Sequence, residues 1–167
     1  NLDGNSWAEV HDNASLDIGD FSLEAWVKFE KQGDYQVFFA KDDGSSDRSY
    51  ELFLHNTEDK FEANIFGGTA AFATQTINDN QWYHVVATFT DSTNAFVSYV
   101  DGAQNKSATV SASQNDTDAP VIIGAWYDKT SYLTHGQIAQ PRIYNRALTA
   151  EEVQRNYDAG KNIYTND

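Results

Sequence analysis

Side chains able to bind a sugar are concentrated in one short segment of the chain, AWYDKTSYLTH at 125–135. Its aromatic rings are of the kind that stack on the apolar faces of sugar rings, and such rings are costly to expose on a loop without a purpose. A carboxylate beside them can accept hydrogen bonds from sugar hydroxyls. The segment predicts a carbohydrate-binding loop, the alternative being that some of its rings fold back over the end of the fold. The predicted ligand-binding residues are Trp126, Tyr127, Asp128, Tyr132 and His135.

A second segment, from Lys41 to Arg48, combines carboxylates with serine hydroxyls and a glycine. Calcium is held in proteins by about six to eight oxygen atoms from carboxylates, carbonyls and water, and such a loop can supply several of them. The spacing is not that of an EF-hand, because the twelfth position counted from Asp42 is Phe53 rather than glutamate. The segment therefore predicts either a site for calcium, the one cofactor that the sequence suggests, or a solvated acidic turn. The predicted metal ligands are Asp42, Asp43 and Asp47, joined by Asp128 if the loops meet at one rim.

The sequence lacks the patterns of an enzyme active site. Glycosidases on all-β sandwiches use two carboxylates on one strand or on facing strands, and no Glu-x-Asp-x-Glu run provides them here. The nearest acidic groups, from Asp59 to Glu62 and at 151–152, are predicted in a turn and on a helix. No Gly-x-Ser-x-Gly elbow or His-Glu-x-x-His pair occurs, and His84 alternates with the apolar face of its strand, which predicts a structural role. We therefore predict that the protein is not an enzyme, with glycoside hydrolysis as the least favoured alternative.

Composition excludes several classes of partner. The chain has 167 residues, with 25 acidic against 11 basic side chains and a net charge of −14. Such a surface repels nucleic acids and anionic membranes, whereas it attracts divalent cations or simply keeps the protein soluble. No apolar run approaches the roughly 18–20 residues of a membrane span, and the absence of cysteine excludes disulfides and thiol catalysis. Because the chain contains no methionine, we expect a mature product or an excised domain.

Alternating apolar and polar residues predict that β-strands carry these groups. The runs at 21–29 and 81–89 each have one apolar face, and Trp26 and Trp82 within them are predicted to pack in the core or on a sheet. We expect roughly ten to twelve such strands, spaced about 8–12 residues apart, which favours a two-sheet sandwich. The Asp-Gly pair at 101–102 predicts a tight hairpin, since this pair tolerates positive φ.

One helix is predicted near the C-terminus. Thr149 is a good N-cap, Glu152 completes a capping box with it, and Gly160 is predicted to end the helix. Pro141 lies inside the preceding strand-like run. It is expected at a sheet edge or a bulge, because proline cannot donate a ladder hydrogen bond.

Five sequence blocks, taken in order, resemble the laminin G-like, concanavalin A-like jelly-roll family, in its bacterial and viral LamG-like branch related to pentraxins. The resemblance implies an all-β fold over 1–167, a single domain that forms a two-sheet antiparallel β-sandwich with one short C-terminal helix. The blocks are LDGNSWAEV (2–10), FSLEAWVKF (21–29), NDNQWYHVVATF (78–89), YVDG (99–102) and GQIAQPRIYNRALTAEEV (136–153).

The same resemblance implies a non-catalytic recognition module, extracellular or otherwise surface-exposed, that binds carbohydrate or a partner protein through rim loops, with weak sites strengthened by multivalency. The alternative is a structural domain that decorates a virion or large surface assembly and binds copies of itself or a scaffold. One departure concerns calcium. The family often has an acidic pair where this chain has Ala139 and Gln140, so the co-ligand that would help Asp3 hold a structural calcium is missing.

Overall fold

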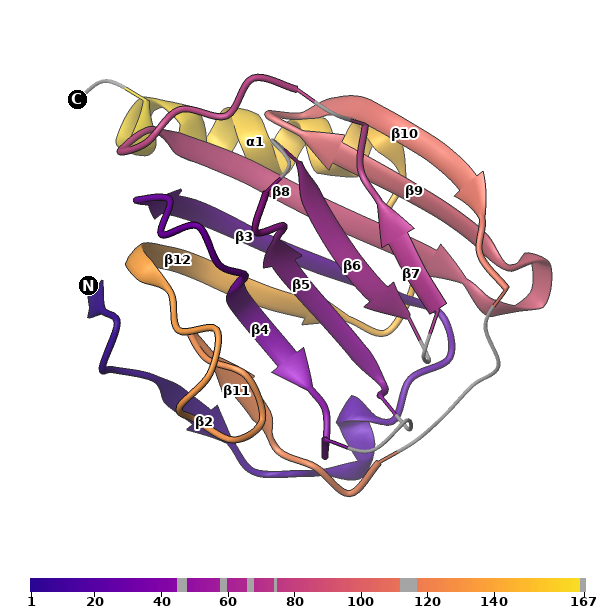
Figure 1. Cartoon of the computed structure of the whole chain (residues 1–167). Coiled ribbons are helices and arrows are strands. Elements are labelled where there is room, and N and C mark those ends of the chain that lie inside the picture. The colour runs from indigo at the N-terminus through magenta and orange to yellow at the C-terminus, as the bar shows by residue number, and fades with distance from the viewer. Residues whose placement is uncertain (45–47, 58–59, 66–67, 74, 112–116, 166–167) are drawn as a thin grey trace.

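Two antiparallel sheets lie face to face and form a sandwich, seen in Figure 1 from the side of the second sheet. The structure, a computed structural model, describes residues 1–44, 48–57, 60–65, 68–73, 75–111 and 117–165. In order across the first sheet, the described strands are β1 (Leu2–Asp3), β12 (His135–Tyr144), β3 (Phe21–Phe29), β8 (Trp82–Thr90), β9 (Ala95–Val100) and β10 (Ala103–Thr109). Across the second sheet they are β2 (Ala8–Val10), β11 (Val121–Ile123), β4 (Gln36–Lys41), β5 (Tyr50–Leu54), β6 (Phe61–Ile65) and β7 (Gly68–Ala71). Two short 3-10 turns, η1 (Ala14–Leu16) and η2 (Asp91–Thr93), lie in the connections. The predicted two-sheet antiparallel jelly roll is confirmed.

The core lies between the sheets and is built from every second residue of the strands. In β3 the inward residues from Phe21 to Phe29 are exposed by 1% or less, as the alternation predicts. They share one buried cluster with Leu52 of β5 and Phe61 of β6. Burial of each large apolar side chain contributes about 1.5–3 kcal/mol. The residues between these inward positions point away from the core, so the outer face of each sheet can carry polar side chains or contact other elements.

Two predicted backbone irregularities are confirmed. Asp101 (φ 51°) and Gly102 (φ 77°) form the two-residue loop between β9 and β10, where Val100 pairs with Ala103. Both residues have positive φ, which is the requirement of a type I′ hairpin. In β12 the register with β3 shifts between Ala139 and Arg142, and Pro141 lies inside this bulge.

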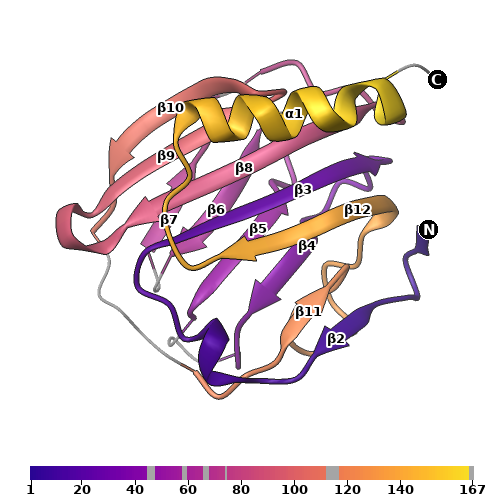
Figure 2. The same cartoon turned by 180° about the vertical axis from the view of Figure 1, so that it is seen from behind.

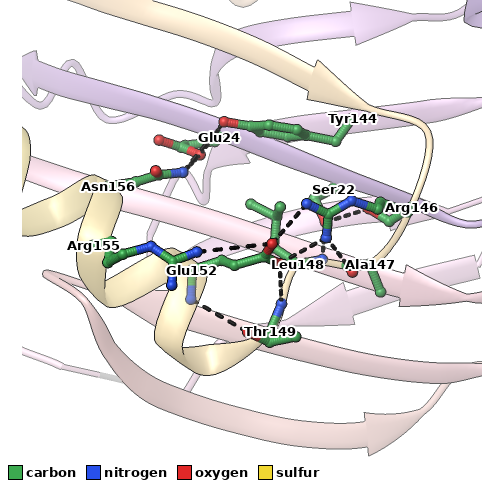
Figure 3. A network of polar contacts seen from close by, with 10 residues as sticks. All are labelled: Ser22, Glu24, Tyr144, Arg146, Ala147, Leu148, Thr149, Glu152, Arg155 and Asn156. Atoms are coloured by element: carbon green, nitrogen blue, oxygen red, sulfur yellow. Dashed lines mark hydrogen bonds and ion pairs between the residues drawn. The ribbon is translucent and has the colours of Figure 1, made fainter.

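The helix α1 (Ala150–Tyr164) starts at a capping box, as predicted. Thr149 accepts a hydrogen bond from the backbone amide of Glu152, and the Glu152 carboxylate accepts one from the backbone of Thr149. Both nitrogens at the tip of Arg146 lie 2.7 Å from the same carboxylate, and this pairing lowers the pKa of Glu152 to about 2 (Figure 3). In the described part of the chain, no helix is both long and apolar enough to cross a bilayer.

The prediction that Gly160 ends the helix is wrong, because α1 continues to Tyr164. Figure 2 shows α1 lying across the outer face of the first sheet. There Gly160 is buried directly against Trp26, where a β-carbon would lie 2.6 Å from the indole Nε1. Tyr157 stacks on the same indole, and Tyr164 packs against both Trp26 and Trp82. The glycine therefore permits close approach rather than termination, and both tryptophans serve packing, as predicted.

A buried carboxylate joins the helix to the first sheet. Glu24 of β3 is 1% exposed and accepts hydrogen bonds from Arg142 (2.8 Å), Tyr144 (3.0 Å) and Asn156 of α1 (2.8 Å), with His84 Nε2 at 3.2 Å (Figure 3 shows Tyr144 and Asn156). Burial pushes the pKa of Glu24 upward, but the hydrogen bonds from His84, Asn156 and Tyr144 outweigh burial and lower it. The predicted structural role of His84 is confirmed.

Candidate functional site

The outer face of the second sheet carries a groove with a volume of about 260 Å³. Alternate residues of β5 and β6 point into the core, so the intervening residues point outward along strands that lie side by side (Figure 1). Glu51 lies opposite Asn64, Phe53 opposite Glu62, and Asn64 opposite Thr69. These five residues form the floor of the groove.

Three aromatic side chains from outside these strands form its wall. Tyr35 precedes β4, whereas Trp126 and Tyr132 lie in the loop between β11 and β12. The ring centroid of Tyr132 is 5.2 Å from that of Tyr35 and 5.1 Å from that of Trp126. Phe53 and Val37 of the sheet pack beneath them in one apolar cluster. The wall is therefore a continuous aromatic surface beside a floor that is polar except for Phe53.

Carboxyl groups hold Trp126 in this wall. Its indole Nε1 donates towards Asp42 Oδ2 and Glu51 Oε1, each at 2.8 Å. The guanidinium of Arg48 lies over the indole, 5.6 Å from the ring centroid, and its Nε is 3.3 Å from Asp42 Oδ2. A ring fixed on its edge and its face loses little conformational freedom when a ligand binds, which favours affinity.

The environment of Glu51 favours its protonated form. The side chain is only 3% exposed, and burial raises the pKa of Glu51 to about 7. The hydrogen bond from Asn64 opposes the rise, whereas neighbouring Asp42 adds to it. Arg48 also lowers the pKa of Glu51, but by less than Asn64 does, since its Nη1 lies 3.7 Å from Glu51 Oε2.

The rest of the floor is polar and internally paired. Lys60 Nζ lies 3.1 Å from Glu62 Oε1. Thr69 donates its hydroxyl hydrogen to Asn64 Oδ1 at 2.8 Å, and Thr69 itself is exposed. The floor thus offers neighbouring donors and acceptors rather than a strong excess of one charge.

The five predicted ligand-binding residues are divided among different surfaces. Only Trp126 and Tyr132 line the groove. Tyr127, 36% exposed, lines a separate cleft of about 570 Å³. Asp128 accepts hydrogen bonds from backbone and hydroxyl groups of its own loop, at 2.6–2.9 Å. His135 begins β12 and lines another depression, which it shares with Tyr132.

The predicted calcium ligands occupy different environments. Asp42 is buried, and its two carboxylate oxygens accept hydrogen bonds from the backbone amide of Gly44 and from the indole. Asp43 is exposed in the cleft that Tyr127 lines, and Asp47 lies outside the described residues. No three His, Asp or Glu side chains among the residues that the structure describes are grouped as metal ligands. A calcium site in this loop stays a prediction.

Sequence reasoning missed most of the floor. Glu51, Asn64 and Thr69 were not predicted, and the assignment of Glu62 to a turn with Asp59 is wrong, because Glu62 lies in β6; Asp59 itself is outside the described residues. A signal was present, since SYELFLH (49–55) and KFEANIF (60–66) both place polar residues at alternate positions. Two neighbouring strands with polar outward positions are expected at an open sheet face.

The sequence of the chain matches the model of the concanavalin A-like lectin/glucanases superfamily over residues 2–154, a span that includes both sheets and the floor and wall of the groove. The chain belongs to this superfamily. The predicted resemblance is thereby confirmed. None of the curated proteins matches the chain.

Several solved structures share the fold of this superfamily member. A protein from Bacteroides ovatus, described as a candidate carbohydrate-binding protein, has a TM-score of 0.75 and 18% identity over 89% of this chain and 44% of its own. The CBM40 of the Ruminococcus gnavus IT-sialidase, bound to α2,3-sialyllactose, has a TM-score of 0.70 and 12% identity over 91% and 96%. The heptameric SAP-like pentraxin of Limulus polyphemus has a TM-score of 0.67 and 14% identity over 82% and 69%. The chain thus spans less than half of the Bacteroides protein, and identities this low show the fold alone.

Proposed function

We propose that the chain is a non-catalytic recognition module that binds a carbohydrate in the groove over the second sheet. The observation that carries this proposal is the aromatic wall of Tyr35, Trp126 and Tyr132 beside a floor of hydrogen-bonding side chains. A sugar ring has an apolar face that packs on aromatic rings and a rim of hydroxyls that both donate and accept hydrogen bonds. Support comes from the similarity to the Ruminococcus CBM40, which is bound to sialyllactose, and to the Bacteroides protein described as a candidate carbohydrate-binding protein.

The size of the groove favours a short ligand. Pockets that enclose drug-sized molecules have volumes of about 300–1,000 Å³, and this groove, at about 260 Å³, lies below that range. We therefore expect it to hold the end of a glycan or a single sugar residue. Affinity per site is then low and rises when several copies bind one surface.

The carboxyl groups of the groove support recognition rather than catalysis. A glycosidase needs one carboxyl group to donate a proton and another to act on the opposite side of the scissile bond. Glu51 is hydrogen-bonded by Trp126 and Asn64, and Glu62 is paired with Lys60. Because both groups are engaged by the protein, we expect no release of reducing sugar when the chain is incubated with a glycan that it binds.

A glycan-array screen followed by calorimetry tests the proposal. Trp126→Ala should weaken binding of any hit by about tenfold or more, since the loss of a well-packed aromatic anchor costs about 1–2 kcal/mol or more. Trp7→Ala is the matched control, because Trp7 is 41% exposed and does not line the groove. It should leave the affinity unchanged.

Thr69→Arg provides a second variant that does not disturb the wall. Thr69 is an exposed residue of the groove floor, so a long side chain there should block the ligand without affecting the core. Circular dichroism confirms that each variant is folded. Absence of any glycan bound by the wild-type chain, or full binding by both Trp126→Ala and Thr69→Arg, would overturn the proposal.

A further inference from the structure

Two carboxyl groups behind the aromatic wall share one hydrogen-bond donor. Asp42 Oδ2 and Glu51 Oε1 each lie 2.8 Å from Trp126 Nε1, so the two oxygens are at most 5.6 Å apart. An indole nitrogen carries a single hydrogen and cannot align it well with two acceptors. The Asp42 and Glu51 side chains are 0% and 3% exposed, so little water is available to either.

The charges around this pair do not balance two carboxylates. Arg48 is the cation in contact with both, at 3.3 Å from Asp42 and 3.7 Å from Glu51, and its side chain is 35% exposed. Lys60 pairs with Glu62 instead. Two buried carboxyl groups this close cannot both ionise without a large cost, unless compensated. Among the described residues, the other ionisable side chains that line the groove or contact its wall include Tyr35, Tyr127, Tyr132, Glu62 and His55.

We propose that Asp42 and Glu51 hold one proton between them and that an uncharged saccharide in the groove retains this proton, so that its affinity falls as the solution becomes alkaline. This inference rests on the proposed function. A neutral ligand replaces the water in the groove that Glu51 lines with a less polar medium, and it thereby disfavours the ionised pair further. By linkage, a ligand that favours the protonated pair binds the protonated protein more tightly.

The same pair selects against anionic sugars. A ligand carboxylate near Glu51 would add a third negative charge to a site in which Arg48 is the contacting cation among the described residues. Burial, opposed by Asn64 and reinforced by Asp42, raises the pKa of Glu51 to about 7, so the second negative charge forms near neutral pH. We therefore expect neutral saccharides to be preferred over their sialylated counterparts, and more strongly at pH 8 than at pH 6.

The shared proton can be observed without a ligand. In ¹H–¹⁵N spectra the indole N–H of Trp126, assigned with Trp126→Phe, should shift with a midpoint near pH 7 in the wild-type chain. Glu51→Gln should remove this transition, whereas Glu62→Gln, the same change elsewhere on the floor, should preserve it. A Trp126 indole signal that does not change between pH 5.5 and 8.5 would overturn the proposal.

The coupling to ligand is measured by calorimetry with the neutral glycan that gives the strongest array signal, and with lactose and α2,3-sialyllactose as a matched pair. We expect the affinity for the neutral glycan to fall about three- to tenfold from pH 6 to pH 8. If the bound ligand raises the pKa of the pair by one unit, the protonated protein binds that ligand about tenfold more tightly than the ionised protein does. Glu51→Gln should bind with little pH dependence, whereas Glu62→Gln, whatever its affinity, should keep the wild-type ratio between the affinities at pH 6 and pH 8.

The outcomes separate the two proposals. Equal wild-type affinity at pH 6 and pH 8 would overturn the coupling and leave carbohydrate binding intact. No glycan bound at either pH would overturn the proposed function and the coupling with it. Histidines change charge between about pH 5 and 8, and the ring of His55 lies 5.2 Å from that of Tyr35. A pH response that persists fully in Glu51→Gln would therefore come from a group other than Glu51 and would also overturn the coupling.

Discussion

Replacement of Gly160 by alanine should destabilise the protein, although alanine is the better helix former. Within a helix alanine is favoured over glycine by about 1 kcal/mol. A β-carbon at position 160, however, would lie 2.6 Å from Nε1 and 2.8 Å from Cε2 of Trp26. Trp26 is 1% exposed and is packed against Tyr157 and Tyr164, so it cannot turn aside. Overpacking of this kind costs about 1–3 kcal/mol, so we expect a net loss of about 1 kcal/mol.

Urea denaturation followed by circular dichroism measures this difference, which corresponds to a fall in Tm of about 2–4 °C. Ala159→Gly is the matched control, because Ala159 is the adjacent exposed residue of α1 and reports the Ala–Gly difference without a new contact. Ala159→Gly should lower the free energy of unfolding by about 1 kcal/mol. If Gly160→Ala instead gains the amount that the control loses, α1 does not rest on Trp26 and the reasoning fails.

Three further predictions concern the carboxyl groups. Glu24→Gln should lower the free energy of unfolding by about 3 kcal/mol, since it leaves buried donors without their charged acceptor; a loss below about 0.5 kcal/mol in urea denaturation would contradict this. The raised pKa of Glu51 means that folded protein keeps a proton that unfolded chain has lost between pH 4.5 and about 7. The free energy of unfolding should therefore fall by up to about 3 kcal/mol as the pH rises from 4.5 to about 7, and Glu51→Gln should flatten this pH profile relative to Glu62→Gln. The predicted calcium site requires that calcium raise the Tm relative to EDTA; a change below about 1 °C would contradict the site and would mean that the hydrogen bonds to Asp42 and Asp128 within the protein already occupy these carboxylates.

The sandwich could be predicted because alternation is a property of adjacent residues. The inward direction of each apolar residue of β3 can be inferred from the residues on either side of it in the sequence. The turn at 101–102 can be inferred from the Asp-Gly pair alone. The end of α1 could not be predicted in the same way. Whether Gly160 ends the helix or lies against another element depends on Trp26, a residue distant in the sequence.

The groove was predicted only in part for the same reason. The ring types of Trp126 and Tyr132 are visible in the sequence, and the structure places both in the wall. Which side chains they face depends on the order β4–β5–β6–β7 across the sheet, and pairing between strands is not encoded in any single segment. Asp42 was predicted as a metal ligand because its segment is acidic. In the structure its Oδ2 accepts a hydrogen bond from the indole of Trp126, which belongs to the loop between β11 and β12.

The four tryptophans lie in three parts of the molecule, and this separation gives the protein its own fluorescent reporters. Trp26 and Trp82 are 1% and 9% exposed beneath α1, Trp126 is half-buried in the groove, and Trp7 is 41% exposed. A soluble quencher should reach Trp7 first and Trp26 last. Variants that each retain one of these tryptophans would show, by emission wavelength and quenching during denaturation, whether α1 detaches from the sheet before the groove unfolds. Occupancy of the groove should then change the fluorescence of a single one of them.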